Sequence, residues 1–291
     1  AAGDRVDGRT DPYAFVRTSY VERYFVLLLL AVLILAAFNL TFRLTAEPVA
    51  QWVESLYATS ALEMIDSGDW VRTTFNGKLD YYNSKPPLNV WILAGAFKLF
   101  GVNFWSLRAV SAIASLLTVL VLMLWTRTFC SPSTALLGGL ILSTSFGFLH
   151  VHSGRSGNPD ALMALCLLLV LVVSTAAERR PWQLVWIGPL CAVVFLLKGM
   201  AVLLPLTVVF IVEALRARHH RAMPWRPIVT AAVLFLVPVV TWGLARWQAD
   251  RWRFLQLLVT QDFLLASTKA IEGHNGSVLY YFDVLQRYHY D

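Results

Sequence analysis

Two carboxylates, Glu54 and Asp160, lie beside long apolar segments, where an ionised side chain is uncommon unless it serves a site. Glu54 follows the apolar pair Trp52-Val53, and Asp160 follows Pro159 at the head of an apolar run. Either carboxylate could accept a proton from a hydroxyl group, as a general base does. For Asp160, stabilisation of a helix N-terminus is an equally good interpretation, because the helix dipole favours a negative charge there.

Three basic residues stand at comparable boundaries. Lys85 precedes two prolines, which fix the backbone and hold Lys85 in an extended conformation. A lysine held in this way suits an anionic phosphate, although a lysine that reaches to the membrane surface explains the pattern equally well. Lys198 closes another apolar run, and Arg155 lies in the turn before Asp160. Lys198 is either an anchoring residue or, with Arg155, a second contact to the phosphate.

The histidines and cysteines do not form a metal-binding pattern. His150 and His152 are two residues apart at the end of an expected helix, so their side chains do not face one another. His274 lies in a loop rich in turn-forming residues, where a single histidine is usually solvated; we keep it as a site candidate. The three cysteines share no metal-ligand spacing, and we interpret them as small apolar side chains.

The elements that must position these residues are membrane-spanning helices. The chain is 57% hydrophobic and 14% charged, with a mean hydropathy of +0.60. Several apolar runs approach or exceed the roughly 20 residues that cross a hydrocarbon layer. We therefore predict an all-α, polytopic membrane helical bundle. The net charge of +6 reports the sidedness of the loops and does not indicate a nucleic-acid partner.

The distribution of Lys and Arg predicts the topology. Residues 1–23 carry four arginines and form a cytoplasmic segment, and residues 24–291 form the transmembrane domain. The first external loop, 43–103, holds an amphipathic surface helix over 49–66 and a short surface or re-entrant helix over 86–101. Seven spans are expected, with an eighth beginning near Leu279: about 24–42, 104–127, 132–150, 160–177, 182–197, 201–215 and 228–246.

This topology places all the unusual polar residues near one external membrane boundary, which predicts a site on that face. The chain begins at Ala1 and ends at Asp291, just as another apolar segment starts, so we interpret it as trimmed or partial and lacking a C-terminal portion.

Five short segments, in this order along the chain, resemble motifs of the polyprenyl-phosphate-sugar glycosyltransferases of the GT-C class. The likeness covers about residues 40–285 and is strongest to aminoarabinose-transferase-like and protein-mannosyltransferase-like members. The matching segments are Val53-Glu54 through Ser67-Gly68-Asp69-Trp70, Asn83-Ser84-Lys85-Pro86-Pro87-Leu88, Arg155-Ser156-Gly157-Asn158-Pro159-Asp160-Ala161, Lys198-Gly199 with Leu203-Leu204-Pro205, and Gly273-His274.

The resemblance implies an inverting membrane glycosyltransferase that takes a sugar from an undecaprenyl-type phosphate and passes it to a lipid, glycan or protein acceptor. It implies a bacterial inner membrane with the active face on the periplasmic side. Glu54 or Asp160 would be catalytic. The residues that would contact the lipid phosphate or the donor are Lys85, Lys198, Arg155, His274, Tyr57 and Tyr82.

Two positions depart from the family pattern. The family's leading aspartate aligns with Val53, which cannot take a proton, and this favours the alternative of a non-catalytic polyprenyl-lipid-binding relative or partner subunit. The glutamate that helps some members to hold a metal aligns with Ser84, so we assign no metal ligands and no cofactor, and a divalent metal stays an alternative. A transporter is a third hypothesis, but no internal repeat or pair of broken spans supports it.

Overall fold

The computed structural model describes residues 20–46, 48–49, 53–83, 85–150, 152–218 and 224–260. This part of the chain is almost entirely helical. The α-helices are α2 (Phe25–Thr41), α3 (Val53–Ser67), α4 (Leu88–Phe100), α5 (Phe104–Thr126), α6 (Pro132–Thr144), α7 (Phe146–Leu149), α8 (Asp160–Ala176), α9 (Ile187–Lys198), α10 (Leu203–Arg218), α11 (Trp225–Asp250) and α12 (Arg253–Val259). Two 3-10 helices, η1 (Pro181–Trp186) and η2 (Gly199–Val202), flank α9.

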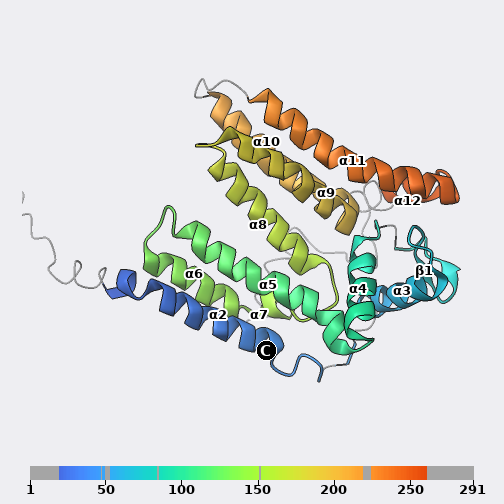
Figure 1. Ribbon diagram of the computed structural model, residues 1–291, viewed down its shortest axis with the longest axis horizontal. Helices are drawn as coiled ribbons and strands as arrows, with labels where there is room; N and C mark the ends of the chain where they lie inside the picture. Colours follow the sequence, from blue (N-terminus) through green and yellow to red (C-terminus); the bar gives the residue numbers. More distant parts are fainter. Residues whose placement is uncertain are drawn as a thin grey trace, which may run out of the picture.

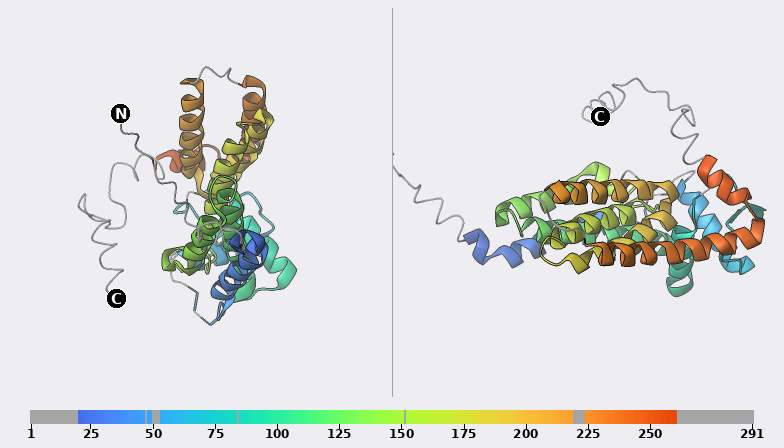
Figure 2. Two further views of the ribbon diagram at one scale, coloured as in Figure 1. Left: turned by 90° about the vertical axis from the view of Figure 1, so that its left-hand side faces the viewer. Right: turned by 90° about the horizontal axis from the view of Figure 1, so that it is seen from above.

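The long helices run roughly along one direction, as Figure 1 shows, with α2 at one side of the bundle and α11 at the other. α5 lies between α2, α6 and α8, and α9 lies between α8 and α11. The left-hand view of Figure 2, which looks along the bundle, shows α10 and α11 on the side opposite α2. The order of packing therefore largely follows the order of the chain, as in antiparallel bundles with short connections.

Local sequence explains where the long helices begin. Asn103 accepts a hydrogen bond from the Ser106 N–H, and Ser106 Oγ accepts one from the Asn103 N–H, which is a capping box at the start of α5. Ser131 caps α6 through the Thr134 N–H, and Pro132 occupies the first helical position. The predicted run 132–150 is not one helix, because Ser145 adopts an extended conformation between α6 and α7.

Both helices predicted for the segment 43–103 are present. Residues 49–66 were expected to be helical; α3 spans Val53–Ser67, and Gly68, with a φ of 69°, ends it as predicted. The buried face of α3 packs against α4 through Tyr57, Ala61 and Met64. The apolar face of α3 therefore packs against α4. Figure 1 shows α4 running across the end of the bundle. That α4 does not span the membrane stays a prediction.

The predicted turn at Asn76-Gly77 joins two short strands, β1 (Thr74–Phe75) and β2 (Lys78–Leu79). The strands pair antiparallel, with Thr74 opposite Leu79. Both turn residues have positive φ, 53° and 70°, as a two-residue hairpin turn of this hand requires.

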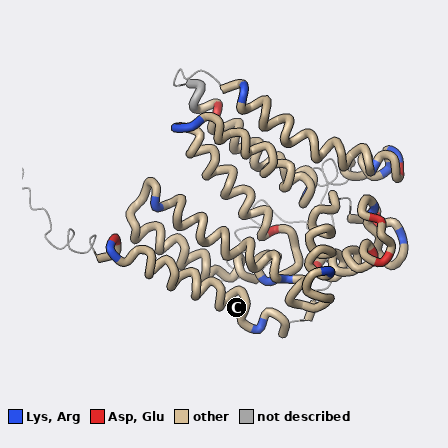
Figure 3. The backbone as a smooth tube through the Cα atoms, viewed as in Figure 1, with Lys and Arg blue, Asp and Glu red and all other residues tan. Residues whose placement is uncertain are grey.

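Within the part of the chain that the structure describes, three helical stretches are long and apolar enough to cross a membrane: Phe104–Thr126, Pro181–Leu215 and Trp225–Asp250. The second is interrupted at Gly199, whose φ of 55° reverses the chain between α9 and α10. Four shorter apolar helices are Phe25–Thr41, Leu88–Phe100, Pro132–Thr144 and Asp160–Ala176. Lys, Arg, Asp and Glu gather at the two ends of the bundle and leave its middle largely uncharged (Figure 3). The seven-span count and its sidedness stay predictions.

Candidate active site at one end of the bundle

Asp160 and Lys198 meet at the end of the bundle that carries α3 and α4. Asp160 is the first residue of α8, and Lys198 is the last residue of the antiparallel helix α9. Lys198 Nζ lies 2.5 Å from Asp160 Oδ1, and the two side chains keep 34% and 28% of their surface exposed. Each charge also faces the helix end that favours it, since the positive end of the dipole is at Asp160 and the negative end at Lys198. The pair is thus an accessible acid–base couple.

The start of α4 is tied to both of these helix ends. Asn89 Nδ2 donates a hydrogen bond to the Gly157 carbonyl, 3.1 Å away, in the loop before α8. On the other side, Leu88 packs in the cluster that contains Leu196, two residues before Lys198. Lys85, which is half-buried, precedes this segment by three residues. The fold thus brings the Lys85 segment to the same end of the bundle as the Asp160–Lys198 pair.

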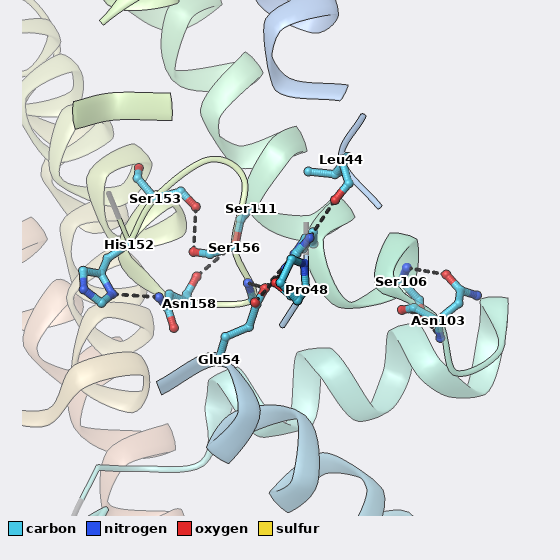
Figure 4. Close-up of polar contacts among 12 residues, drawn as sticks. Leu44, Pro48, Glu54, Asn103, Ser106, Ser111, His152, Ser153, Ser156 and Asn158 are labelled. Atoms are coloured by element: carbon cyan, nitrogen blue, oxygen red, sulfur yellow. Dashed lines mark hydrogen bonds and ion pairs between the residues drawn. The ribbon is translucent and has the colours of Figure 1, made fainter. Parts of the chain in front are cut away.

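Glu54 is fully buried, with 1% of its surface exposed, in an ion pair with Arg108 of α5. Arg108 Nε and Nη2 each lie 2.8 Å from one of the two carboxylate oxygens of Glu54. The guanidinium also donates to the Leu44 and Pro48 carbonyls, at 2.7 and 3.0 Å. This two-pronged geometry is the strongest arrangement of an arginine and a carboxylate. Figure 4 shows the Glu54 side chain pointing towards the Pro48 segment.

The same carboxylate holds the loop that leads into α8. Glu54 Oε1 accepts a hydrogen bond from the Gly157 N–H at 2.9 Å, and Ser111 Oγ of α5 donates to the Asn158 carbonyl at 3.0 Å (Figure 4). A Cβ at Gly157 would lie 2.7 Å from Leu107 Cδ1, so glycine lets the loop lie this close to α5 without displacing Leu107. Side chains of α3, α4 and α5 therefore fix the backbone two and three residues before Asp160.

This geometry separates the two candidate carboxylates. Both oxygens of Glu54 are already bound by Arg108, and the group is shielded from solvent, whereas Asp160 is reachable. The arrangement favours Asp160 over Glu54 as the proton acceptor. The choice of base stays a prediction.

The other predicted site residues are spread over several environments. Arg155 is 9% exposed, and its Nη1 donates to the Asn39 carbonyl near the end of α2, at 2.7 Å. Tyr57 is 2% exposed in the core between α3 and α4, whereas Tyr82 is 58% exposed. The expected contacts of these side chains with a donor stay predictions. Ser84 and His274 lie outside the described residues.

Val53, which stands where the family has an aspartate, begins α3 and packs against the α3–α4 core. Within the described residues, no group of three His, Cys, Asp or Glu side chains is placed to hold a metal ion. The hydroxyl of Ser84 is a poor substitute for a carboxylate ligand of a divalent metal, so this donor set does not fit the family-type metal site.

Arg108 is a central residue that the sequence reasoning missed. It sits in the second turn of an expected span, within an apolar run that has no other charge until Arg127. An isolated arginine at membrane depth almost always pairs inside the protein, so its position was an available signal.

Asp69, just after the end of α3, forms a separate local unit with Arg72. Partial burial raises the pKa of Asp69, but hydrogen bonds from the Arg72 N–H and guanidinium and from the Val71 N–H outweigh it and hold that pKa below its usual range. These contacts form a closed turn, which explains Asp69 as a structural carboxylate.

Comparisons with known proteins agree with this architecture. The family model described as dolichyl-phosphate-mannose-protein mannosyltransferase matches residues 84–242, more than half of the chain. The chain is 31% identical over 232 residues to the undecaprenyl phosphate-alpha-4-amino-4-deoxy-L-arabinose arabinosyl transferase of Pseudomonas savastanoi, covering 76% of this chain and 43% of that protein. It is 32% identical over 244 residues to an uncharacterized protein of Aquifex aeolicus, covering 82% and 46%.

The fold is also similar to a solved structure, that of ArnT from Cupriavidus metallidurans bound to undecaprenyl phosphate. The TM-score is 0.71 at 24% sequence identity, over 89% of this chain and 47% of that one. The chain therefore spans less than half the length of the relatives it matches. The match to the family model and the identity to the curated relatives show that this chain belongs to the dolichyl-phosphate-mannose-protein mannosyltransferase family.

Proposed function

We propose that this chain carries the active face of a membrane glycosyltransferase. The enzyme transfers a sugar from a polyprenyl phosphate, of the undecaprenyl type, to a lipid, glycan or protein acceptor. The active face is periplasmic, in a bacterial inner membrane. The observation that carries the proposal is the accessible Asp160–Lys198 pair at one end of a bundle of this family. The names of the relatives, which act on or bind undecaprenyl phosphate compounds, support the donor class.

The pair supplies both charges that the reaction needs. The acceptor hydroxyl attacks the anomeric carbon, its proton passes to Asp160, and the bond from that carbon to the phosphate oxygen breaks. The bonding electrons leave with the phosphate, which gains one negative charge as Asp160 loses one. The Lys198 ammonium group can therefore pair with the Asp160 carboxylate before the reaction and with the departing phosphate after it. Its positive charge is balanced by a negative charge at both stages.

Lys85 adds a second positive charge for the same phosphate. Its position before two prolines limits the backbone conformations of the segment, and Asn89 anchors that segment to the Gly157 loop. Two lysines on one phosphate divide the developing charge between them, which lowers the barrier to departure of the lipid phosphate.

Glu54 acts as a positioning residue in this proposal. Through Arg108 and the Gly157 N–H it joins α3, α5 and the loop before Asp160 in one buried network. A general base must be held within hydrogen-bonding reach of the proton it accepts, and this network defines where α8 begins.

The decisive experiment compares Asp160→Asn and Lys85→Ala with wild type in membranes that contain the whole protein. Transfer of radiolabelled sugar from a synthetic undecaprenyl phosphate sugar is measured. We expect a fall of roughly 10²–10⁴-fold for Asp160→Asn, the usual contribution of a general base, and of roughly 10²–10³-fold for Lys85→Ala. Asp66→Asn and Lys78→Ala, on exposed residues of the same loop, are the matched controls. Wild-type rates in the Asp160 and Lys85 variants would refute the mechanism.

A second function, that of a non-catalytic lipid-binding relative, is favoured by one observation. Val53 opens α3, where the family pattern has an aspartate, and its side chain packs into the α3–α4 core. On this proposal the chain binds polyprenyl phosphate without transferring sugar.

The variant Val53→Asp distinguishes the two functions. A wild-type protein that is silent in the transfer assay and becomes active with aspartate at position 53 supports the non-catalytic reading. A wild-type protein that already transfers sugar through Asp160 excludes it.

A further inference from the structure

A groove of about 980 Å³ opens between the last turns of α5 and α8. It lies at the opposite end of α8 from Asp160, about 24 Å away by helical rise. Figure 1 shows α5 and α8 spreading apart towards this end. Its walls are apolar and come from both helices and from the turn that follows α5: Val121, Leu124, Trp125, Phe129, Leu169 and Val172.

The rim of the groove is positively charged. Glu178, Arg179 and Arg180 follow α8 and line the opening, so that two arginines stand against one glutamate. Both arginines are exposed, and neither forms an ion pair with another residue in the part of the chain that the structure describes. By contrast, Arg127, on the neighbouring turn of α5, pairs with Glu22.

Aromatic side chains mark the depth of this rim in the bilayer. Trp182 and Trp186 of η1, which follows the two arginines, are 61% and 62% exposed. Exposed tryptophans of this kind concentrate at the level of lipid headgroups. The arginines at the rim therefore lie where lipid phosphates lie, and the apolar walls lie where acyl chains lie.

We propose that this groove binds an anionic phospholipid. Its phosphate contacts Arg179 and Arg180, and one acyl chain follows the wall from Phe129 towards Val121. Basic pockets between membrane helices bind anionic headgroups in this way, and arginine engages a phosphate through two parallel hydrogen bonds. The proposal rests on the fold alone and does not depend on the transferase activity.

The test measures lipid retained by the purified whole protein. The protein is delipidated in detergent, titrated with dioleoyl phosphatidylglycerol or dioleoyl phosphatidylcholine, and analysed by native mass spectrometry. We expect wild type to prefer phosphatidylglycerol. The double variant Arg179→Gln/Arg180→Gln should bind phosphatidylglycerol about thirtyfold more weakly, since each arginine adds to the attraction of an anionic surface.

Two further variants separate charge from space. Ala176→Phe fills the groove and should weaken the binding of both lipids, because Ala176 lines its wall. Arg226→Gln removes another exposed arginine, one that stacks on Trp225 and does not line the groove, and should leave binding unchanged. Equal retention of the two lipids by wild type, or unchanged retention in the double arginine variant, would overturn the proposal. The absence of any bound lipid would also overturn it and would point to a protein segment or a second copy as the occupant.

Discussion

At the scale of single residues, the Glu54–Arg108 pair explains how charge is tolerated inside the bundle. The two side chains are 1% and 3% exposed, and each satisfies the other in two-pronged geometry. A buried charge that loses its partner is left uncompensated, which is far more destabilising than the loss of an exposed pair. The stability of this end of the molecule therefore depends on both residues together.

We predict that Arg108→Met lowers the free energy of unfolding by about 3–5 kcal/mol, because the buried carboxylate of Glu54 loses the guanidinium that binds both of its oxygens. Unfolding of the detergent-purified protein by heat or denaturant measures this loss. The double variant Glu54→Leu/Arg108→Met should recover part of it. Arg127→Met, which breaks a partly exposed pair with Glu22, should cost no more than about 1 kcal/mol. A loss for Arg108→Met as small as that for Arg127→Met would contradict the argument.

At the scale of elements, close approach of backbones sets the geometry of both α8 and α9. Gly157 lets the loop before α8 lie against α5, and Gly188 lets α9 lie against α11. Sequence patterns that identify the helices say little about these contacts, since a glycine within an apolar run does not reveal which neighbour it meets.

Gly157→Ala tests the loop. The added Cβ would lie 2.7 Å from Leu107 Cδ1 and 3.3 Å from the Leu107 carbonyl oxygen, so either Leu107 or the loop must shift. Because Leu107 is buried, we expect the loop to move and to carry the start of α8 with it. Displacement of a catalytic group by about 1 Å lowers rates by roughly 10²-fold, and we expect a fall of this size in sugar transfer. Gly147→Ala, where no atom lies within 4 Å of the added Cβ, is the control and should retain activity.

Gly188→Ala tests the contact between helices. Its Cβ would lie 2.1 Å from the Ala231 carbonyl oxygen, a backbone atom, so α9 and α11 must separate. We expect the free energy of unfolding to fall by about 1–3 kcal/mol, as for other overpacked cores. Gly243→Ala, in an open position on α11, should be neutral or slightly stabilising. Equal unfolding temperatures for the two variants would refute this explanation of the contact.

At the scale of the whole molecule, charge is divided between the two ends of a long apolar bundle (Figure 3). The candidate active site occupies one end, and the proposed lipid groove occupies the other. This arrangement fits a protein whose chemistry takes place on one membrane face while its other end lies among the lipids of the opposite leaflet.

Cysteine labelling tests the sidedness. Single cysteines at Asp66 and Trp182, in a chain whose three native cysteines are replaced, are treated with a membrane-impermeant maleimide. Asp66→Cys should react in intact cells with a permeabilised outer membrane, and Trp182→Cys only after lysis, because the arginine-rich loops are expected inside. Labelling of both positions from the same side would refute the seven-span topology.

The sequence by itself determined the class of molecule and most of its helices. Long apolar runs leave the chain no alternative to helices in a membrane, because each helix satisfies its own backbone hydrogen bonds. The turn at Asn76-Gly77 and the end of α3 at Gly68 were equally readable, since both need a positive φ. The candidate residues Lys85, Asp160 and Lys198 were also identified, because charges at membrane boundaries are rare.

Only the tertiary structure decided which of those residues pair with one another and which are buried. Periodicity could not pair Asp160 with Lys198, 38 residues away, or bury Glu54 against Arg108, 54 residues away, because long-range contacts are set by packing between helices. Packing also turned Arg155 towards the end of α2. Packing between helices also leaves Asp160 within reach of solvent and surrounds Glu54 with hydrogen-bond donors. No local sequence pattern records this difference between the two candidate carboxylates.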